Sequence, residues 1–221
     1  MFWLLVLRRL TDVICISSIV EYIKLLKLKI NLLIFPGGFF EGNNISSFRS
    51  YLRKNPPNVA LIVGWDKKTG KNDKKREKQN SKREIWAVSS NGEIKTRIRE
   101  AWIGKGGKIN KEILKNIQKR KCIVGQVSVD LYCCGDVLID KRHFNGKLAA
   151  ITAHQSARGR AFSPAMRNLN KPVFLSHFVM HPYKTKDFAY NGATNLKAIA
   201  VVNNNECSLE QVEWQARIYS L

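Results

Sequence analysis

The sequence shows no apolar run long enough to cross a membrane. The apolar stretch at the start, from Phe2 to Leu7, is too short to span a bilayer, and the positive charges of Arg8 and Arg9 follow it. A secretory signal peptide carries its positive charge before the apolar stretch. We therefore expect neither a signal peptide nor a membrane span, and interpret residues 1–10 as a first strand or as a non-native start.

Cysteines are few and are not spaced for disulfide bridges or metal binding. The chain has five among 221 residues, an odd and scattered set that does not form a disulfide framework. Neither Cys15 nor Cys122 has a partner at CxxC spacing. His177 and His181 form an HxxxH pair, but Pro182 follows and the segment has strand and loop character, so we expect no metal site. This cysteine usage favours a reducing cytoplasm.

Acidic residues are scarce. Only 17 Asp and Glu stand against 38 Lys and Arg, which gives a formal net charge of +21. This charge suits a polyanion partner such as nucleic acid, but it also fits a general Lys- and Asn-rich composition. Nine basic residues and two acids lie in the basic segment from Lys67 to Arg83, which has no aromatic residue on which a base could stack. We expect residues 66–83 to form a solvated, mobile loop that binds polyanions without specificity.

The remaining pattern is that of one α/β domain. The chain is 44% hydrophobic, enough for a single core, and we expect one domain over residues 1–221. Segments with strand patterns alternate with helical ones. The expected strands are 1–10, 30–35, 59–65, 84–89, 94–98, 127–133, 148–153, 172–177 and 196–203. The expected helices are about 11–28, 46–54, 109–121 and 162–169, and residues 206–221 have no assignment.

A hairpin is the strongest local signal. Residues 84–89 and 94–98 alternate in polarity around Ser90-Asn91-Gly92, and an Asn-Gly pair favours a tight turn between two strands. Several of the other expected strands are almost continuously apolar, as is typical of strands buried on both faces. Together these patterns predict an α/β sandwich.

The stretch from Val127 to Asp140, VSVDLYCCGDVLID, organises the chain. Its first half alternates as a buried strand, which runs directly into Cys133, Cys134 and Gly135. A thiol at the end of a core strand, followed by glycine, lies where a tight turn can expose it at the rim of a sheet. Asp136 can orient that turn or hold its backbone N–H groups. The arrangement is similar to a nucleophile elbow, and a buried cysteine that serves as a small hydrophobe is the alternative.

Taken in order, these pieces resemble the nitrilase (carbon–nitrogen hydrolase) superfamily. The resemblance rests on LLIFPGG at 32–38, VALIVGW at 59–65, IWAVSSNGEIKTRI at 85–98, CGD at 134–136 and AAITAHQS at 149–156. It extends over residues 15–205. It implies a nitrilase-like α-β-β-α sandwich with mixed sheets and helices on the outer faces, an activity on C–N bonds, and no cofactor.

The resemblance implies that Cys134 is the nucleophile. In this superfamily a cysteine attacks an amide or nitrile carbon, and a thioester is then hydrolysed. Asp136 takes the acidic position of the family's Cys-x-Asp/Glu pattern. A shifted alignment would place Ser128-Val129-Asp130 on the same pattern, but Cys134 fits better because a strand precedes it.

The other two catalytic positions of the family are altered in this chain. The superfamily uses a glutamate as general base and a lysine to stabilise the tetrahedral intermediate. Gly37 occupies the glutamate position, so Glu41, four residues on in the same loop, is the candidate base. The segment aligned with the lysine, residues 96–102, contains no lysine; Lys105 is the nearest candidate and Arg99 is the other cation.

The candidate substrate-binding residues are Asp136, His154, Gln155 and Trp102. His154 and Gln155 follow an expected strand, in a loop that lines the pocket in the family, although a capping or loop role fits them equally well. Trp102 could form a wall of the pocket, and core packing is the commoner fate of such a side chain.

These features predict a nitrilase-like hydrolase of small amides or nitriles. The alternative is a catalytically inactive nitrilase-like fold that serves as a binding module, for polyanions among other partners. We expect no membrane partner, and a homodimer remains open.

Overall fold

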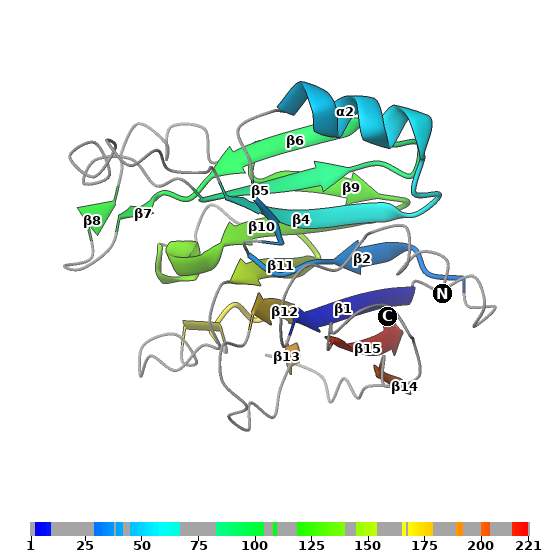
Figure 1. The fold of residues 1–221 in the computed structure, drawn as a ribbon. Coiled ribbons are helices and arrows are strands. Elements are labelled where there is room, and N and C mark those ends of the chain that lie inside the picture. The colour runs from blue at the N-terminus through cyan, green and yellow to red at the C-terminus, as the bar shows by residue number, and fades with distance from the viewer. Residues whose placement is uncertain are drawn as a thin grey trace.

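Strands make up most of the residues that can be described in the computed structural model (Figure 1). The structure describes residues 3–9, 29–37, 39–41, 45–66, 83–103, 108–109, 119–139, 145–153, 165–166, 168–178, 189–191, 200–203 and 214–220.

A 13-stranded mixed sheet is the frame of the fold, and its main path runs β6-β5-β4-β2-β1-β12-β11-β10-β9. In chain order these strands are β1 (Trp3–Arg9), β2 (Leu32–Ile34), β4 (Ala60–Asp66), β5 (Arg83–Val88), β6 (Ile94–Arg99), β9 (Lys121–Val124), β10 (Val127–Cys133), β11 (Leu148–Ala153) and β12 (Pro172–Phe178). Neighbouring strands from β4 to β10 along this path are parallel, whereas β5, β6 and β9 are antiparallel to their neighbours. The carboxyl ends of the parallel strands therefore lie along one edge.

Short strands extend this frame. β3 (Phe40–Glu41) runs parallel to the end of β4, and β13 (Ala189–Asn191) runs antiparallel to β12. β15 (Trp214–Ser220) pairs antiparallel with both β1 and β14 (Ala200–Asn203). A separate two-stranded pair joins β7 (Trp102–Ile103) to β8 (Lys108–Ile109).

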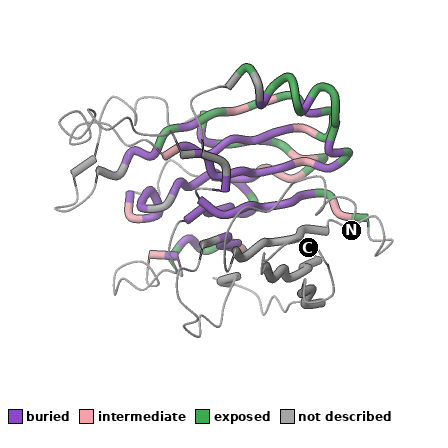
Figure 2. Tube along the Cα trace, viewed as in Figure 1, coloured by how far each residue is buried: buried purple, intermediate pink, exposed green. Residues whose placement is uncertain are grey.

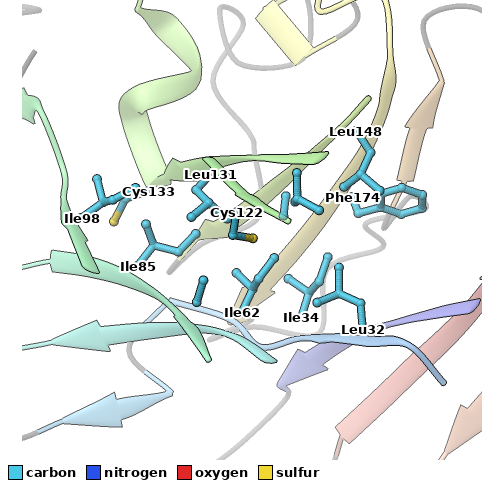
Figure 3. Close-up of a cluster of buried hydrophobic side chains, with 13 residues drawn as sticks. Leu32, Ile34, Ile62, Ile85, Ile98, Cys122, Leu131, Cys133, Leu148 and Phe174 are labelled. Atoms are coloured by element: carbon cyan, nitrogen blue, oxygen red, sulfur yellow. The ribbon is translucent and has the colours of Figure 1, made fainter. Parts of the chain in front are cut away.

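The sheet doubles back so that its two halves enclose one apolar core (Figure 3). Side chains from β2, β4, β5 and β6 pack there against side chains from β9, β10, β11 and β12, because alternate residues of each strand point inward. The buried members of this cluster are Leu32, Ile34, Ile62, Ile85, Ala87, Ile98, Cys122, Val129, Leu131, Cys133, Leu148, Ala150 and Phe174.

Helix α2 (Ile45–Lys54) covers the outer face of one half, over β4, β5 and β6 (Figure 1). Its Phe48 is 7% exposed, and the Phe48 ring lies 5.2 Å from Trp65 and 5.5 Å from Trp86. The two indoles stack at 4.4 Å, with 6° between their planes. Other residues of the helix are exposed, so Figure 2 shows one green side of α2 above purple strands. This aromatic cluster attaches the helix to the sheet.

The outer face of the other half is also covered. Ile151 and Val173, which point away from the first core, pack with the helical residue Met166 and with Leu169 in the turn that follows. The layers are therefore helix, sheet, sheet and helix, which is the α-β-β-α sandwich expected from the sequence.

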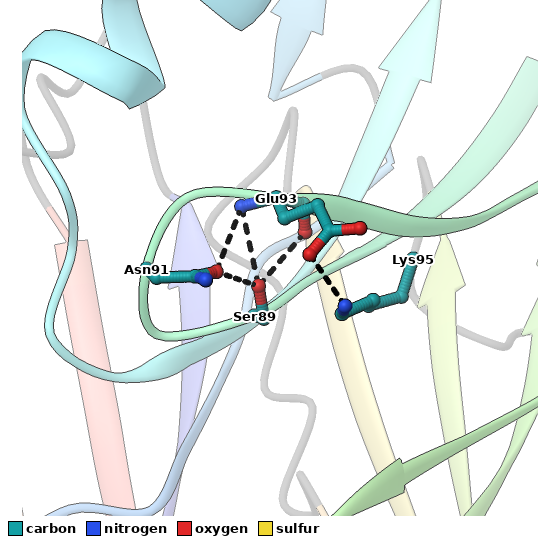
Figure 4. Close-up of polar contacts among 4 residues, drawn as sticks. All are labelled: Ser89, Asn91, Glu93 and Lys95. Atoms are coloured by element: carbon teal, nitrogen blue, oxygen red, sulfur yellow. Dashed lines mark hydrogen bonds and ion pairs between the residues drawn. The ribbon is translucent and has the colours of Figure 1, made fainter.

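The predicted hairpin joins β5 to β6 (Figure 4). Gly92 N–H donates to the carbonyl of Ser89 at 2.9 Å, and Ser89 N–H donates to the carbonyl of Glu93 at 2.8 Å. The Asn91 carboxamide oxygen accepts from the backbone N–H of Glu93 at 3.3 Å. Gly92 has a φ of 83°, while Asn91 does not take a positive φ. The hairpin is confirmed, and its turn uses one left-handed residue, a Gly, instead of two.

The expected helix at 46–54 and the expected strands are confirmed where the structure describes them, with differences of a few residues at their ends. Of the strand expected at 196–203, residues 196–199 lie outside the described residues. The helix expected at 109–121 is wrong at both of its described ends. Ile109 belongs to β8 instead of starting a helix. Lys121 begins β9 instead of ending a helix, because Gly125, with a φ of 59°, turns residues 121–124 back against β10. Residues 214–220, without an assignment from sequence, form β15. The predicted helix at 11–28, most of those at 109–121 and 162–169, and residues 67–82 lie outside the described residues.

Candidate active site

The end of β10 and the loop after β2 lie on the same edge of the sheet. Cys133, the last residue of β10, is in register with Thr152 of β11. One residue further along β11, the carbonyl of Ala153 accepts from the N–H of Gly37 at 3.0 Å. Cys134 therefore follows its strand at the edge where the Pro36-Gly37 loop lies. In parallel sheets this carboxyl edge is where ligands bind.

The two adjacent cysteines occupy different environments. Cys133 continues the inward alternation of Val129 and Leu131, is 1% exposed, and lies in the apolar core near Ile85 and Ile98 (Figure 3). Cys134 is the first residue of a 3-10 helix, Cys134–Leu138, that leaves the strand. Its side chain lies outside the described part of the structure. Cys133 is thus the core thiol, and the backbone of Cys134 is at the strand-to-turn junction that a nucleophile requires.

Asp136 holds this turn from inside. Its carboxylate is buried and accepts hydrogen bonds from the N–H of Cys133 at 3.1 Å and from the N–H of Ala101 at 2.7 Å. It also forms an ion pair with Arg120. The role suggested by sequence, that the acid holds backbone N–H groups of the turn, is confirmed by these bonds. Direct contact with substrate, the other predicted role of Asp136, would require them to break.

Arg120 connects the turn to the end of β6. Its side chain is 1% exposed, and Nη2 donates to the carbonyl of Arg99 at 2.6 Å while Nη1 donates to Asp136. Burial raises the pKa of Asp136, and the guanidinium of Arg120 together with the two backbone N–H donors opposes that rise. The pair therefore fixes the position of Cys133 relative to residues 99–101.

Glu100 supports the turn from the opposite sheet. It comes two residues after Ile98, so the alternation of β6 continues inward to it. Glu100 is 3% exposed, and its Oε1 accepts from the N–H of Gly135 at 3.1 Å. Its Oε2 lies 3.8 Å from Nη1 of Arg83, whose side chain is 44% exposed. A carboxylate thus contacts the residue directly after Cys134.

The loop after β2 is packed too closely for a side chain opposite it. A Cβ built on Gly64 would lie 2.4 Å from both the Gly37 Cα and the Pro36 carbonyl oxygen. Phe35 N–H donates to the carbonyl of Ile62 at 2.8 Å, which fixes the start of the loop on β4. The backbone at Gly37, which the resemblance aligns with the family's glutamate, is therefore packed directly against Gly64.

The candidate base Glu41 lies further along this edge. It is in register with Asp66 at the end of β4, and Asp66 is in register with Arg83 of β5. Glu100 N–H in turn donates to the carbonyl of Arg83 at 2.9 Å. These four backbones form a row across the sheet, with Glu41 at one end and Glu100 at the other. The carboxylate of Glu41 is outside the described side chains.

The remaining predicted site residues lie mostly outside the described residues. Lys105, His154 and Gln155 belong to this group. The backbone of Trp102 is in β7, in register with Ile109 of β8, and its side chain is not described. The structure thus brings together the Cys134 turn, Asp136 and the loop at Gly37.

Sequence reasoning missed Glu100 and Arg120. The sequence did contain a signal that could have identified Glu100: it is a charged residue at an inward position of an alternating strand. Arg120 lay in a segment assigned to a helix, which hid its partnership with Asp136, 16 residues away.

Two further features of the described residues bear on function. They contain no group of three or more His, Cys, Asp or Glu placed to hold a metal ion. No helix among them is long and apolar enough to cross a membrane.

Comparison with known proteins finds likeness at the level of structure. No protein-family model matches the sequence, and no curated protein matches it. The NitN amidase from Nesterenkonia sp. AN1 superposes with a TM-score of 0.53 at 13% identity, over 80% of this chain and 78% of that one. In a structure of a Glu-to-Gln mutant of that amidase, acrylamide has undergone Michael addition at the active-site cysteine (TM-score 0.53, 13% identity, 80% and 79% covered). XC1258 from Xanthomonas campestris, a CN-hydrolase superfamily protein with an arsenic adduct in its active site, gives 0.51 at 12% identity, over 80% and 76%.

These likenesses agree with the sandwich and with the resemblance found in the sequence. The chain has the fold of the nitrilase superfamily of carbon–nitrogen hydrolases.

Proposed function

We propose that this protein hydrolyses the C–N bond of small amides or nitriles through Cys134. The observation that carries the proposal is the end of β10, where Cys134 begins a turn that the buried carboxylate of Asp136 holds through the N–H of Cys133. A nucleophile needs such a rigid, strand-anchored turn. The fold is shared with an amidase whose active-site cysteine adds to acrylamide in a Glu-to-Gln mutant, and this supports the assignment.

The chemistry on an amide has two steps. The Cys134 thiolate attacks the carbonyl carbon, a C–S bond forms, and the C–N bond breaks as nitrogen takes a proton and leaves as ammonia. Water then attacks the thioester and releases the carboxylic acid and the thiol. We assign Glu41 as the proton acceptor, Lys105 as the cation that stabilises the oxyanion, and His154, Gln155 and Trp102 to the pocket. Asp136 is assigned as a positioning residue.

The test is ammonia release from acetamide, propionamide and acetonitrile by the full chain. We expect turnover by the wild type and none by Cys134→Ala. Cys133→Ala is the matched control, because its thiol belongs to the core; it should lose stability and keep activity. Equal turnover by wild type and Cys134→Ala would refute the assignment, as would loss of activity only in Cys133→Ala.

A second function is favoured by one specific observation. Gly37 stands at the family's glutamate position, and Glu100 places a negative charge at the N–H of Gly135. Both features oppose amide hydrolysis, and they suit an inactive fold that serves as a binding module. Absence of turnover in all variants, with ligand binding retained, would favour this alternative.

A further inference from the structure

The carboxylate of Glu100 lies close to the proposed nucleophile. Glu100 Oε1 accepts from Gly135 N–H at 3.1 Å, and that nitrogen is one peptide bond from Cys134. Standard peptide geometry then places Oε1 within about 6 Å of the Cys134 Cα. The contact is enclosed, because Glu100 is 3% exposed and Gly135 is buried. A negative charge is therefore held beside the turn with little water to screen it.

The hydrogen bond also uses a donor that acyl transfer needs. When a thiolate attacks a carbonyl carbon, the carbonyl oxygen becomes negative and must be stabilised by N–H donors or cations. In nucleophile turns the N–H of the residue after the nucleophile is such a donor. Here that residue is Gly135, and its single N–H bonds an oxygen that is already anionic.

Among the described residues, Arg83, Arg120 and Asp136 are charged groups near Glu100 or near the turn that it bonds. Arg83 of β5 approaches Oε2 at 3.8 Å, but its side chain is 44% exposed, so solvent weakens the attraction. Arg120 donates to Asp136 and to the carbonyl of Arg99. Asp136 is the other carboxylate that bonds the turn, and its ion pair with Arg120 offsets its charge. Of these two carboxylates, Glu100 is the one that accepts a hydrogen bond from the residue directly after Cys134.

We propose that Glu100 is a built-in occupant of the oxyanion donor at Gly135, and that its charge suppresses the reactivity of the Cys134 thiol. Acyl transfer at Cys134 then requires the carboxylate to leave the Gly135 N–H. The part of this proposal that concerns acyl transfer rests on the proposed function. The effect of Glu100 on the reactivity of the Cys134 thiol does not depend on that function.

The first test is the rate at which iodoacetamide, a neutral reagent, alkylates Cys134, measured against pH by peptide mass spectrometry with fragment assignment. Glu100→Gln keeps an oxygen that can accept from Gly135 and removes the charge. A unit charge about 6 Å from a sulfur atom, which is the scale that the distance to the Cys134 Cα sets, shifts a thiol pKa by about 0.5 to 2 units, depending on the local dielectric. We expect Glu100→Gln and Glu100→Ala to alkylate about 3 to 100 times faster than wild type at pH 7. Glu93→Gln, at the exposed hairpin tip, should not change the rate.

Two results would overturn the proposal. One is a rate for Glu100→Gln equal to or below that of the wild type, in protein with an unchanged circular dichroism spectrum. The other needs no variant: a wild-type Cys134 pKa at or below the ordinary thiol value of about 8.5 would show that no neighbouring anion raises it. Ammonia release separates the two proposals. Faster alkylation in Glu100→Gln without turnover in any variant refutes the hydrolase and retains the role of Glu100.

Discussion

The carboxylate of Asp136 and the guanidinium of Arg120 form an ion pair in which neither side chain is more than 1% exposed. The pair lies between the turn that contains Cys134 and the end of β6, because Asp136 also bonds the N–H of Ala101 and Arg120 also bonds the carbonyl of Arg99. Both halves of the sandwich are therefore linked at the candidate site by one buried pair.

Removing the charge of Asp136 should destabilise the whole fold. Asp136→Ala leaves the guanidinium of Arg120 buried without its counterion, which typically costs about 3–5 kcal/mol of unfolding free energy. Urea denaturation measures the change. Glu93→Ala is the control: its ion pair with Lys95 is at the surface, so the loss should stay within about 0.5 kcal/mol. A loss from Asp136→Ala no larger than that of the control would show that the pair does not hold the sandwich together.

The fold was predictable because the residues of each core strand themselves indicate that the strand is buried. β10 and β11 alternate or run apolar over their full length, and the hairpin is marked by Asn91-Gly92. β9 was missed since four residues, Lys121 to Val124, form an edge strand whose Ile123 is 74% exposed. Such a strand is defined by its pairing with β10, which sequence does not display.

Only those features of the candidate site that depend on neighbouring residues in the sequence were predictable. The position of Cys134 follows from the strand before it and the glycine after it. The bonds of Asp136 to Ala101 and of Glu100 to Gly135 each join residues 35 positions apart, so they depend on how the two halves of the sheet face each other. No local sequence pattern indicates which residues 35 positions apart come into contact. The resemblance pointed to Lys105 as a functional residue, and not to Glu100.

Gly64 should not tolerate alanine. The added Cβ would meet backbone atoms of Pro36 and Gly37 at 2.4 Å, and backbone cannot move aside as a flexible side chain can. We expect Gly64→Ala to lose about 2–4 kcal/mol of stability, at the upper end of overpacking effects, and to displace the loop at the candidate site. Gly125→Ala is the matched control. No atom lies within 4 Å of the Cβ that this variant adds, so its only cost in stability comes from placing alanine at a φ of 59°, about 1 kcal/mol. Equal losses in thermal unfolding would contradict the packing argument.

The protein should lose stability at alkaline pH because of Cys122. Burial, with a contribution from the charge of Asp130, raises the pKa of Cys122 from 9.0 to about 12. The folded state therefore retains a proton that the unfolded chain releases, and stability declines as the pH rises from 9 toward 12. At pH 10.5 the loss from this thiol is about 2 kcal/mol.

Comparing the wild type with Cys122→Ala isolates this thiol. The variant should be less stable at pH 7, because a buried sulfur is removed, and its stability should fall less steeply above pH 9. Tyr132, whose pKa is also raised by burial, adds a further decline at higher pH, so Tyr132→Phe is the companion variant. Parallel stability curves for wild type and Cys122→Ala between pH 9 and 11 would exclude the thiol as a source of alkaline unfolding.

The basic segment should bind nucleic acid weakly and without sequence preference. A chain with a net charge of +21 releases counterions from any polyanion, so its affinity at low salt carries little information. Without aromatic residues, Lys67 to Arg83 offers no stacking contacts, and affinity should fall steeply as salt rises to about 150 mM.

A deletion can test this without disturbing the sandwich. Asp66 and Arg83 are register partners at the end of the β4–β5 pair, so residues 67–82 can be replaced by an Asn-Gly turn that closes the hairpin. Arg83 is kept because it contacts Glu100. We expect the replacement to remove most of the affinity for DNA and RNA in a salt titration, and to leave Cys134 alkylation unchanged. Tight, sequence-selective binding at about 150 mM salt that survives the replacement would make nucleic-acid recognition the main function, because electrostatic attraction alone does not persist under those conditions.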